Sequence, residues 1–127
     1  MKQLTKAEEQ IMHILWKLQK AFVKDIIDHM PDPKPAYNTV STIVRILEKK
    51  GFVSHEPLGN SHQYFPVVEK SEYTQNYLRH FVKNYFSNSY KQMVSFFTKE
   101  EKLSISEMEE MRRMIDEEIS KQKNNNK

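Results

Sequence analysis

Residues 36–51 constrain the fold most, because they divide into two opposed faces when the segment is wound as an α-helix. One face carries the apolar side chains, which are Ala36, Val40, Ile43, Val44 and Leu47. The opposite stripe has i, i+3, i+4, i+7, i+11 spacing and carries short hydrogen-bonding side chains followed by cations, namely Asn38, Ser41, Thr42, Arg45 and Lys49.

The polar stripe carries the residue types that proteins use to contact DNA bases and phosphates. Asn, Ser and Thr are mediocre helix formers, so a helix with an exposed stripe of them is less stable than one with Glu and Lys at the same positions. A major groove is read by these residue types, with Asn on adenine, Ser or Thr on bases and phosphates, and Arg on guanine. The segment alone favours a DNA-reading helix over an ordinary solvated helix face.

Two helices are predicted before this segment. The first opens at Thr5-Lys6-Ala7-Glu8, a capping box, and carries an apolar stripe beside Trp16 down to about residue 20. The second covers residues 22–30 and ends before Pro31-Asp32-Pro33-Lys34-Pro35, because proline cannot continue a helix. The third is residues 36–51 and ends at Gly51. Three short helices of this kind predict a helix-turn-helix domain.

A β-hairpin is predicted directly after the third helix. Residues 52–56 and 62–67 are rich in β-branched and aromatic side chains, and residues 57–61 between them have turn composition. A hairpin in this position is the wing of a winged helix. The predicted fold is therefore mainly α with a small β-hairpin, as a winged helix-turn-helix domain over residues 1–70.

Residues 71–121 are predicted to form a helical dimerisation domain. Aromatic residues recur every fourth position at Tyr73, Tyr77, Phe81 and Tyr85, and a second capping pattern opens at Ser104. A helical part of about 55 residues cannot bury a sufficient hydrophobic core alone, so we expect it to pack against the same part of a second subunit. The alternative is that these helices pack on the winged helix of their own chain. The expected dimer contacts are Tyr77, Phe81, Tyr85, Phe96, Phe97, Met108, Met111 and Ile115. Residues 122–127 are expected to be a disordered tail.

Composition limits the remaining classes. The chain has 127 residues and a net charge of +3, and residues 34–50 hold Lys34, Arg45, Lys49 and Lys50 against Glu48, a local net charge of +3. There is no cysteine and no apolar run or leader of the kind a membrane protein needs, which indicates a cytoplasmic protein without membrane insertion. The five histidines never fall at i, i+3 or i+4, and no phosphate loop or nucleophile elbow is present. We expect no catalytic residue, metal or cofactor, and no enzyme.

Several motifs resemble the penicillinase-repressor (BlaI/MecI/CopY) family. They are Thr5-Lys6-Ala7-Glu8, Trp16, Asn38-Thr39-Val40-Ser41-Thr42-Ile43, Leu47-Glu48-Lys49-Lys50-Gly51-Phe52 and Phe96-Phe97-Thr98-Lys99-Glu100-Glu101-Lys102-Leu103-Ser104, within a similarity over about residues 4–121. The resemblance implies a winged-helix repressor that dimerises through its C-terminal helices on a palindromic operator, in genes for β-lactam resistance or copper handling. It marks Tyr37, Asn38, Thr39, Ser41, Thr42 and Arg45 as DNA-reading positions and Asn60, Ser61 and His62 as the wing tip.

The resemblance also bears on release from DNA. In the β-lactam branch a membrane sensor and protease pathway leads to cleavage of an Asn-Phe bond, which aligns here with Ser95-Phe96, so the asparagine is replaced. The copper branch ends in paired cysteines, which this chain lacks, and copper sensing by that route is excluded.

The sequence therefore predicts a homodimeric repressor of double-stranded operator DNA, controlling a β-lactam-resistance-type or related operon. Two alternatives remain open. One is a small-molecule-responsive regulator of the multidrug type, with Tyr73, Tyr77, Phe81 and Tyr85 lining a pocket. The other is a winged-helix adaptor that binds a protein, which would lack the steep salt dependence of a phosphate-contacting protein.

Overall fold

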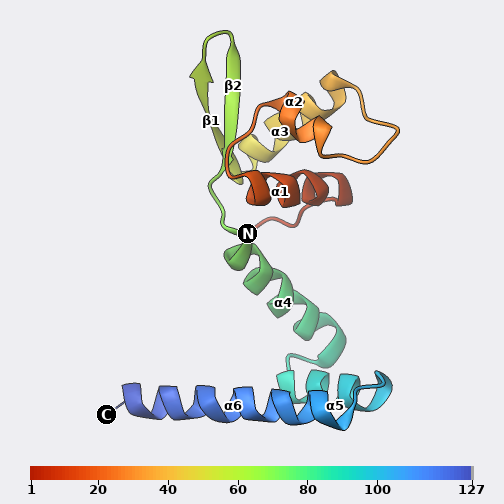
Figure 1. Ribbon diagram of the computed structural model, residues 1–127, viewed down its shortest axis with the longest axis vertical. Coiled ribbons are helices and arrows are strands. Elements are labelled where there is room, and N and C mark those ends of the chain that lie inside the picture. The colour runs from red at the N-terminus through yellow and green to blue at the C-terminus, as the bar shows by residue number, and fades with distance from the viewer. Residues whose placement is uncertain (127) are drawn as a thin grey trace. The chain divides into compact units, whose positions relative to one another are not determined.

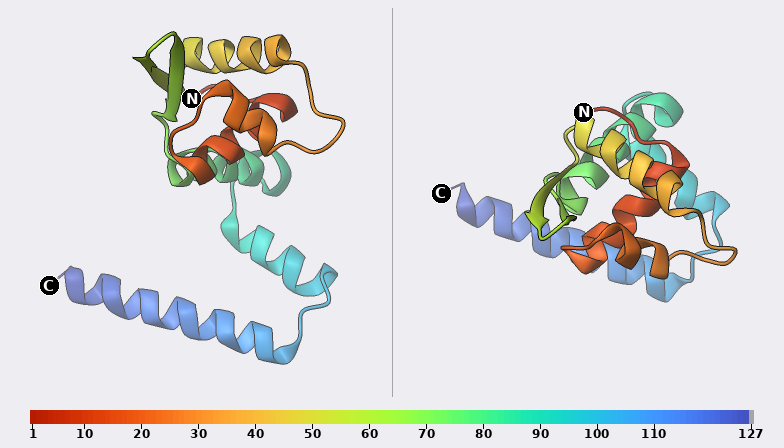
Figure 2. Two further views of the ribbon diagram at one scale, coloured as in Figure 1. Left: turned by 45° about the horizontal axis from the view of Figure 1, so that its top comes forward. Right: turned by 90° about the horizontal axis from the view of Figure 1, so that it is seen from above.

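A computed structural model describes residues 1–126, which form six helices and one hairpin in two compact units, residues 1–79 and the part from residue 80 onward (Figure 1, Figure 2). The first unit contains α1 (Lys6–Leu18), α2 (Val23–Asp28), α3 (Tyr37–Lys49), β1 (Val53–Leu58) and β2 (Ser61–Pro66). Helix α4 (Lys70–Phe86) begins in the first unit and ends in the second. The second unit continues with α5 (Tyr90–Glu100) and α6 (Ile105–Asn125). The predicted winged helix, mainly α with a small hairpin, is confirmed.

Local hydrogen bonds set the start of α1 and the end of α2. At α1 the Glu8 amide donates to Thr5 Oγ1 at 3.2 Å and the Thr5 amide donates to Glu8 Oε1 at 2.8 Å, which completes the predicted capping box. Helix α2 is shorter than the predicted residues 22–30, because the amides of His29 and Met30 close the last turn on Ile26 and Ile27 just before Pro31.

The hairpin is tighter than the sequence predicts. Its strands pair antiparallel from Val53 with Pro66 to Leu58 with Ser61, so the loop is Gly59 and Asn60 rather than residues 57–61. Gly59 has φ +61°, which the first position of such a two-residue turn favours. Pro57 can lie inside β1 because each strand of a two-stranded sheet has an unpaired side where a missing amide costs little.

The core of the first unit lies between α1, α2, α3 and the base of the hairpin. Its fully buried side chains include Ile11, Leu15, Ile26, Val40 and Phe52. The hairpin is attached to the α1–α2 turn by two hydrogen bonds, because the amides of Ala21 and Tyr64 each donate to the other residue's carbonyl, at 2.9 and 2.8 Å.

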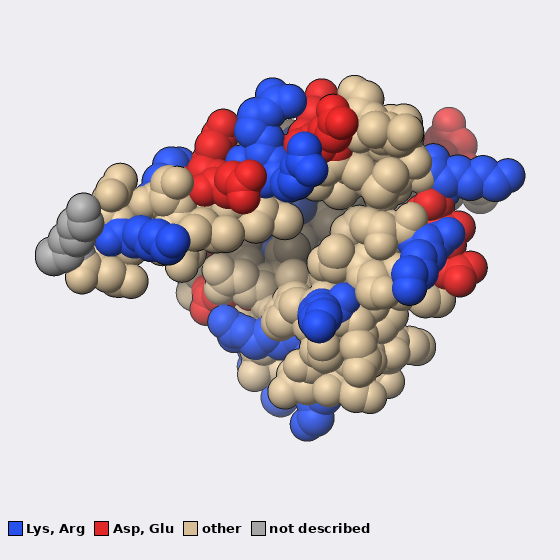
Figure 3. Space-filling model, turned by 90° about the horizontal axis from the view of Figure 1, so that it is seen from below, with Lys and Arg blue, Asp and Glu red and all other residues tan. Residues whose placement is uncertain are grey.

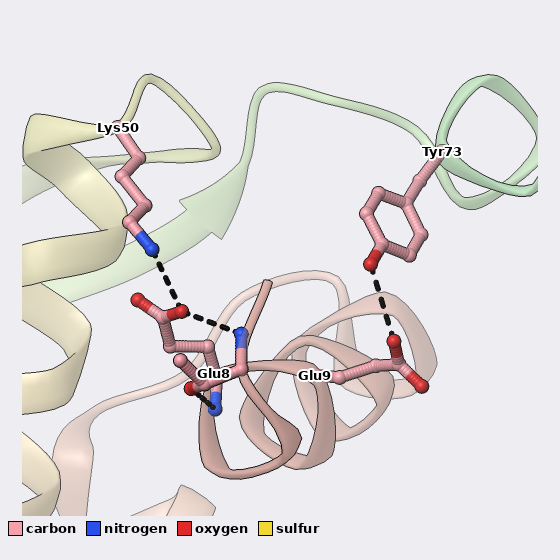
Figure 4. A network of polar contacts seen from close by, with 5 residues as sticks. Glu8, Glu9, Lys50 and Tyr73 are labelled. Carbon is pink, nitrogen blue, oxygen red and sulfur yellow. Dashed lines mark hydrogen bonds and ion pairs between the residues drawn. The ribbon is translucent and has the colours of Figure 1, made fainter. Parts of the chain in front are cut away.

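The start of α4 belongs to the winged helix, which moves the unit boundary from the predicted residue 70 to residue 79. Trp16 Nε1 donates to the Val68 carbonyl at 2.9 Å, and the Tyr73 ring packs on Trp16 and Phe52. Figure 4 shows the Tyr73 hydroxyl reaching Glu9 Oε2, at 3.1 Å. Tyr73 is therefore a core residue, whereas Tyr77, one helical turn further along α4, is exposed.

The second unit is open and largely exposed. Ser87 and Asn88 have positive φ and break α4 from α5, and Ser104 Oγ accepts from the Glu107 amide at 3.1 Å to cap α6. Helix α6 runs to Asn125, so residues 122–125 extend a helix where the sequence predicts disorder, because Lys and Gln readily continue a helix that is already nucleated. Residue 127 of the predicted tail lies outside the described residues. Acidic and basic side chains are interspersed on the face in Figure 3.

Candidate DNA-binding surface

Helix α3 and the hairpin line one groove of about 520 Å³. From α3 it receives Tyr37, Ser41 and Arg45, and from the wing it receives Asn60, Ser61 and His62. Six of the ten predicted DNA-binding residues, which are far apart in sequence, thus border a common surface. The groove also contains residues that sequence reasoning missed, namely Phe22, Val23, Lys24, Asp25, Leu58 and Tyr64. Lys24 was on the polar side of the second predicted helix, but only packing of α2 on α3 brings it here.

The other four predicted residues lie on α3 outside the groove lining, and all four are exposed: Asn38, Thr39, Thr42 and Lys49. The opposite face of α3 is the buried one, with Val40, Val44 and Leu47 fully buried and Ile43 partly buried. Ala36 does not belong to that face, because it is the exposed N-cap residue. The two-faced pattern therefore describes α3 from its first turn onward.

The polar stripe makes hydrogen bonds along its own helix. Thr42 Oγ1 donates to the Asn38 carbonyl at 2.8 Å, which leaves the hydroxyl oxygen as an acceptor. Arg45 lies along the helix, with Nε 3.4 Å from the Ser41 carbonyl and Nη2 3.5 Å from Thr42 Oγ1. Both Arg45 contacts are at the long limit of hydrogen bonding, so they oppose only weakly a rotation of the guanidinium toward a ligand.

The local cation count of residues 34–50 overstates the charge available to a ligand. Lys34 Nζ donates to the carbonyl of Met30 at 2.8 Å and lies 3.3 Å from that of Asp28, so it satisfies the C-terminal end of α2. Lys50 Nζ pairs with Glu8 Oε1 at 2.8 Å. Arg45 and Lys49 are the cations of this segment that the described structure leaves on the exposed face of α3.

The Glu8–Lys50 pair joins the start of α1 to the end of α3 (Figure 4). Burial by itself would raise the pKa of Glu8, but the hydrogen bond and charge of Lys50 and the two hydrogen bonds to Thr5 outweigh it, so the pKa is lowered. The Glu8 side chain is only 6% exposed and that of Lys50 is 23% exposed. The pair therefore has a structural role, fixing the frame that holds α3.

The predicted dimer contacts lie in the second unit or on the exposed side of α4. Phe81 and Tyr85 border one groove of about 700 Å³ with Phe96 and Ser95. A second groove of about 390 Å³ is almost wholly apolar and is lined by Phe97, Met108, Met111 and Ile115 among others. Tyr77 is exposed on α4. Of the four aromatics of the small-molecule alternative, Tyr73 is buried in the winged-helix core.

The aligned cleavage position, the Ser95-Phe96 bond, lies inside α5, and both residues are exposed. Over residues 1–126, no helix is long and apolar enough to cross a membrane. In the same part of the chain, no group of three or more His, Asp or Glu side chains is placed to hold a metal ion.

A helix with a polar, cationic outer face beside a two-stranded wing defines a winged helix-turn-helix DNA-binding protein. The penicillinase repressor family model matches residues 4–117, so the chain belongs to the penicillinase repressor family, whose members are DNA-binding transcriptional repressors and not enzymes. The chain is 27% identical over 114 residues to the methicillin resistance regulatory protein MecI of Staphylococcus aureus strain N315, covering 89% of this chain and 93% of MecI.

Two further relatives agree with this assignment. The penicillinase repressor of Bacillus licheniformis is 24% identical over 122 residues, which is 95% of each chain. Among solved structures, the DNA-binding domain of the repressor BlaI is similar with a TM-score of 0.50 and 26% identity, over 56% of this chain and 88% of that domain.

Proposed function

We propose that this repressor binds a palindromic operator as a homodimer, with α3 of each subunit in a major groove. The groove that joins Tyr37, Ser41 and Arg45 to the wing residues Asn60, Ser61 and His62 carries the proposal. A reading helix and a wing on one surface can engage the base edges and the adjacent backbone together.

Different roles follow for the residues of the surface. Arg45 and either Asn38 or Thr42 contact base edges, because Arg pairs with guanine and Asn with adenine. Ser41, Thr39, Lys49 and Tyr37 contact phosphates along α3, and Asn60, Ser61 and His62 contact the backbone or minor groove from the wing. The phosphate contacts fix the position of the protein on DNA without reading sequence.

Exposed apolar side chains in the second unit support the dimer. Among residues 80–126, Val82 is the single hydrophobic side chain that is fully buried. Phe96 is 54% exposed and Ile115 is 56% exposed. Apolar grooves border both of them. A helical part that buries so little alone gains by packing on an identical copy.

The dimer is tested by sedimentation of the full chain. We expect Ile115→Glu to shift the protein to monomer, because a carboxylate would lie in the apolar groove. Glu110→Lys, at another exposed position on α6, serves as the control for a change of charge and should leave the dimer intact. A wild-type chain that sediments as a monomer at micromolar concentration would overturn the dimer.

The operator is tested by selecting bound duplexes from a random DNA library with the full chain. We expect an inverted repeat whose half-sites lie about 34 Å, or a small multiple of that, apart. Arg45→Ala should lose about 1–3 kcal/mol of discrimination at one base pair of each half-site. Selection of asymmetric sites, or unchanged discrimination in R45A, would contradict the assigned roles.

We further propose that the target is a β-lactam-resistance-type or related operon, which the likeness to MecI supports. Cleavage between Ser95 and Phe96 by a membrane sensor and protease pathway would release the repressor, since it separates α6 from the DNA-binding unit. Mapping the selected operator in the host genome tests the first point. Intact-mass measurement after induction tests the second, and a chain that stays full-length during derepression would exclude cleavage.

A further inference from the structure

Two histidines of the wing form a stacked pair on the side that faces α3. The His55 and His62 rings lie 4.2 Å apart between centroids and only 12° from parallel. The strand register pairs His55 with Tyr64 and Pro57 with His62, which places both histidines on the same side of the hairpin as Tyr64. His62 is exposed and lines the groove, whereas His55 is half-buried with Nδ1 2.7 Å from Glu48 Oε2.

The wing has no permanent cation. Residues 53–66 contain neither Lys nor Arg, and their ionisable side chains are His55, Glu56, His62 and Tyr64. Burial raises the pKa of Tyr64, and Glu48 raises it further, so this phenol stays neutral near pH 7. Glu56 alternates to the other side of the hairpin. Positive charge on the groove side of the wing therefore comes only from protonated imidazole.

We propose that His55 and His62 form a proton-dependent phosphate-binding site, so that DNA binding takes up a proton at each wing. This inference rests on the proposed contact between the wing and the DNA backbone. It adds a linkage between pH and affinity, and it identifies the group that supplies the charge.

The neighbours of the pair place His62 where a phosphate can reach it. Glu48 Oε2 lies 2.7 Å from His55 Nδ1, so α3 orients the inner ring of the stack. His62, the outer ring, lies in the same groove as Arg45, Lys24 and Asp25. A phosphate at the exposed edge of His62 supplies a charge-assisted acceptor for a protonated imidazole. Protonated His62 is thus the proposed DNA-bound form.

The ring geometry argues against a metal ion as the ligand. Ring nitrogens coordinate along directions in the plane of the imidazole, and the planes of two stacked rings run parallel and do not converge. Nδ1 of His55 is also occupied by Glu48. An anion that approaches the exposed edge of His62 does not require such convergence.

The test measures affinity of the full chain for a duplex of arbitrary sequence, since phosphate contacts are independent of sequence. At constant ionic strength, affinity should rise by roughly 3- to 10-fold per subunit from about pH 8 to about pH 6, the range in which histidine titrates. H62Q should remove this rise, and H62K should bind tightly at both pH values. H13Q, a surface histidine on α1, should behave as wild type.

The outcomes separate the two proposals. No binding of the wild-type chain at low salt and either pH would overturn the proposed DNA function itself. Binding that does not change with pH, or a rise that H62Q retains in full, would overturn the histidine site while leaving DNA binding intact. Calorimetry in buffers of different ionisation enthalpy gives an independent measure. A 3- to 10-fold rise over two pH units corresponds to uptake of roughly 0.25–0.5 proton per wing near pH 7 in the wild type, and we expect none in H62K.

Discussion

The adjacent lysines Lys49 and Lys50 should have unrelated functions, and the pair of variants Lys49→Met and Lys50→Met separates them. Lys50 is held in the pair with Glu8, whereas Lys49 is exposed on the outer face of α3. Methionine keeps most of the length of the lysine side chain and removes its charge. Each variant is therefore the matched control of the other.

Lys50→Met should act on stability. Removing one partner of a buried ion pair costs about 3–5 kcal/mol because the other charge remains desolvated. The 23% exposure of Lys50 reduces this to about 2–3 kcal/mol of lost unfolding free energy. In a unit of this size that loss lowers the Tm by roughly 10–20 °C. The slope of log affinity against log salt should not change.

Lys49→Met should act on DNA binding. The melting temperature should stay within about 4 °C of wild type, because surface substitutions of this kind usually change stability by less than about 0.5 kcal/mol. The slope of log affinity against log salt should fall by about 0.9 per subunit, the value for one lost phosphate contact on duplex DNA.

The stability effect of Lys50→Met also has a defined pH dependence. The pKa of folded Glu8 is lowered from its usual value of 4.5, so the pair stabilises the fold above that value, and the stabilisation is lost as pH falls through the lower folded pKa. Thermal melts and fluorescence anisotropy titrations on the full chain measure both effects. A Lys50→Met variant that changes the salt slope and not the Tm, or whose destabilisation persists in full at acid pH, would refute the structural role of Lys50.

Three further substitutions test the frame around the site. Tyr73→Phe should reduce the free energy of unfolding by about 1 kcal/mol in chemical denaturation, because it removes the hydroxyl that donates to Glu9, and no change would show that this contact is neutral. Gly59→Ala should cost about 1–2 kcal/mol in the same measurement, because alanine disfavours φ +61°, although open space surrounds the new Cβ. Thr5→Ala should cost about 1 kcal/mol through loss of the α1 cap, and Ser71→Ala, at an exposed position, should cost close to nothing.

Local sequence signals predicted most of the first unit. The capping box at Thr5, the prolines after residue 30 and the apolar spacing of α3 each act within one or two turns of chain, and the structure confirms their consequences. The predicted hairpin loop was too long because Pro57 has turn composition, and only the pairing of β1 with β2 shows that the strand tolerates it.

Contacts between distant segments were not predictable in this way. The pairing of Glu8 with Lys50 joins residues 42 positions apart, and that of Glu9 with Tyr73 joins residues 64 positions apart. Because of the first contact, a lysine that appears to belong to a DNA-binding patch is structural. Because of the second, Tyr73, which the sequence groups with Tyr77, Phe81 and Tyr85 by its spacing, is part of the winged-helix core.

The sequence by itself determined that the N-terminal part forms three helices and a wing, and that one face of α3 is polar. Periodicity and capping are short-range, so they are visible in the order of residues alone. The tertiary structure decided how the polar groups around α3 are arranged: it places Arg45 beside the wing, ties Lys34 to the C-terminal carbonyls of α2, pairs Lys50 with Glu8, and stacks His55 on His62. These outcomes depend on how helices and strands pack, and packing brings together side chains whose separation in sequence carries no local signal.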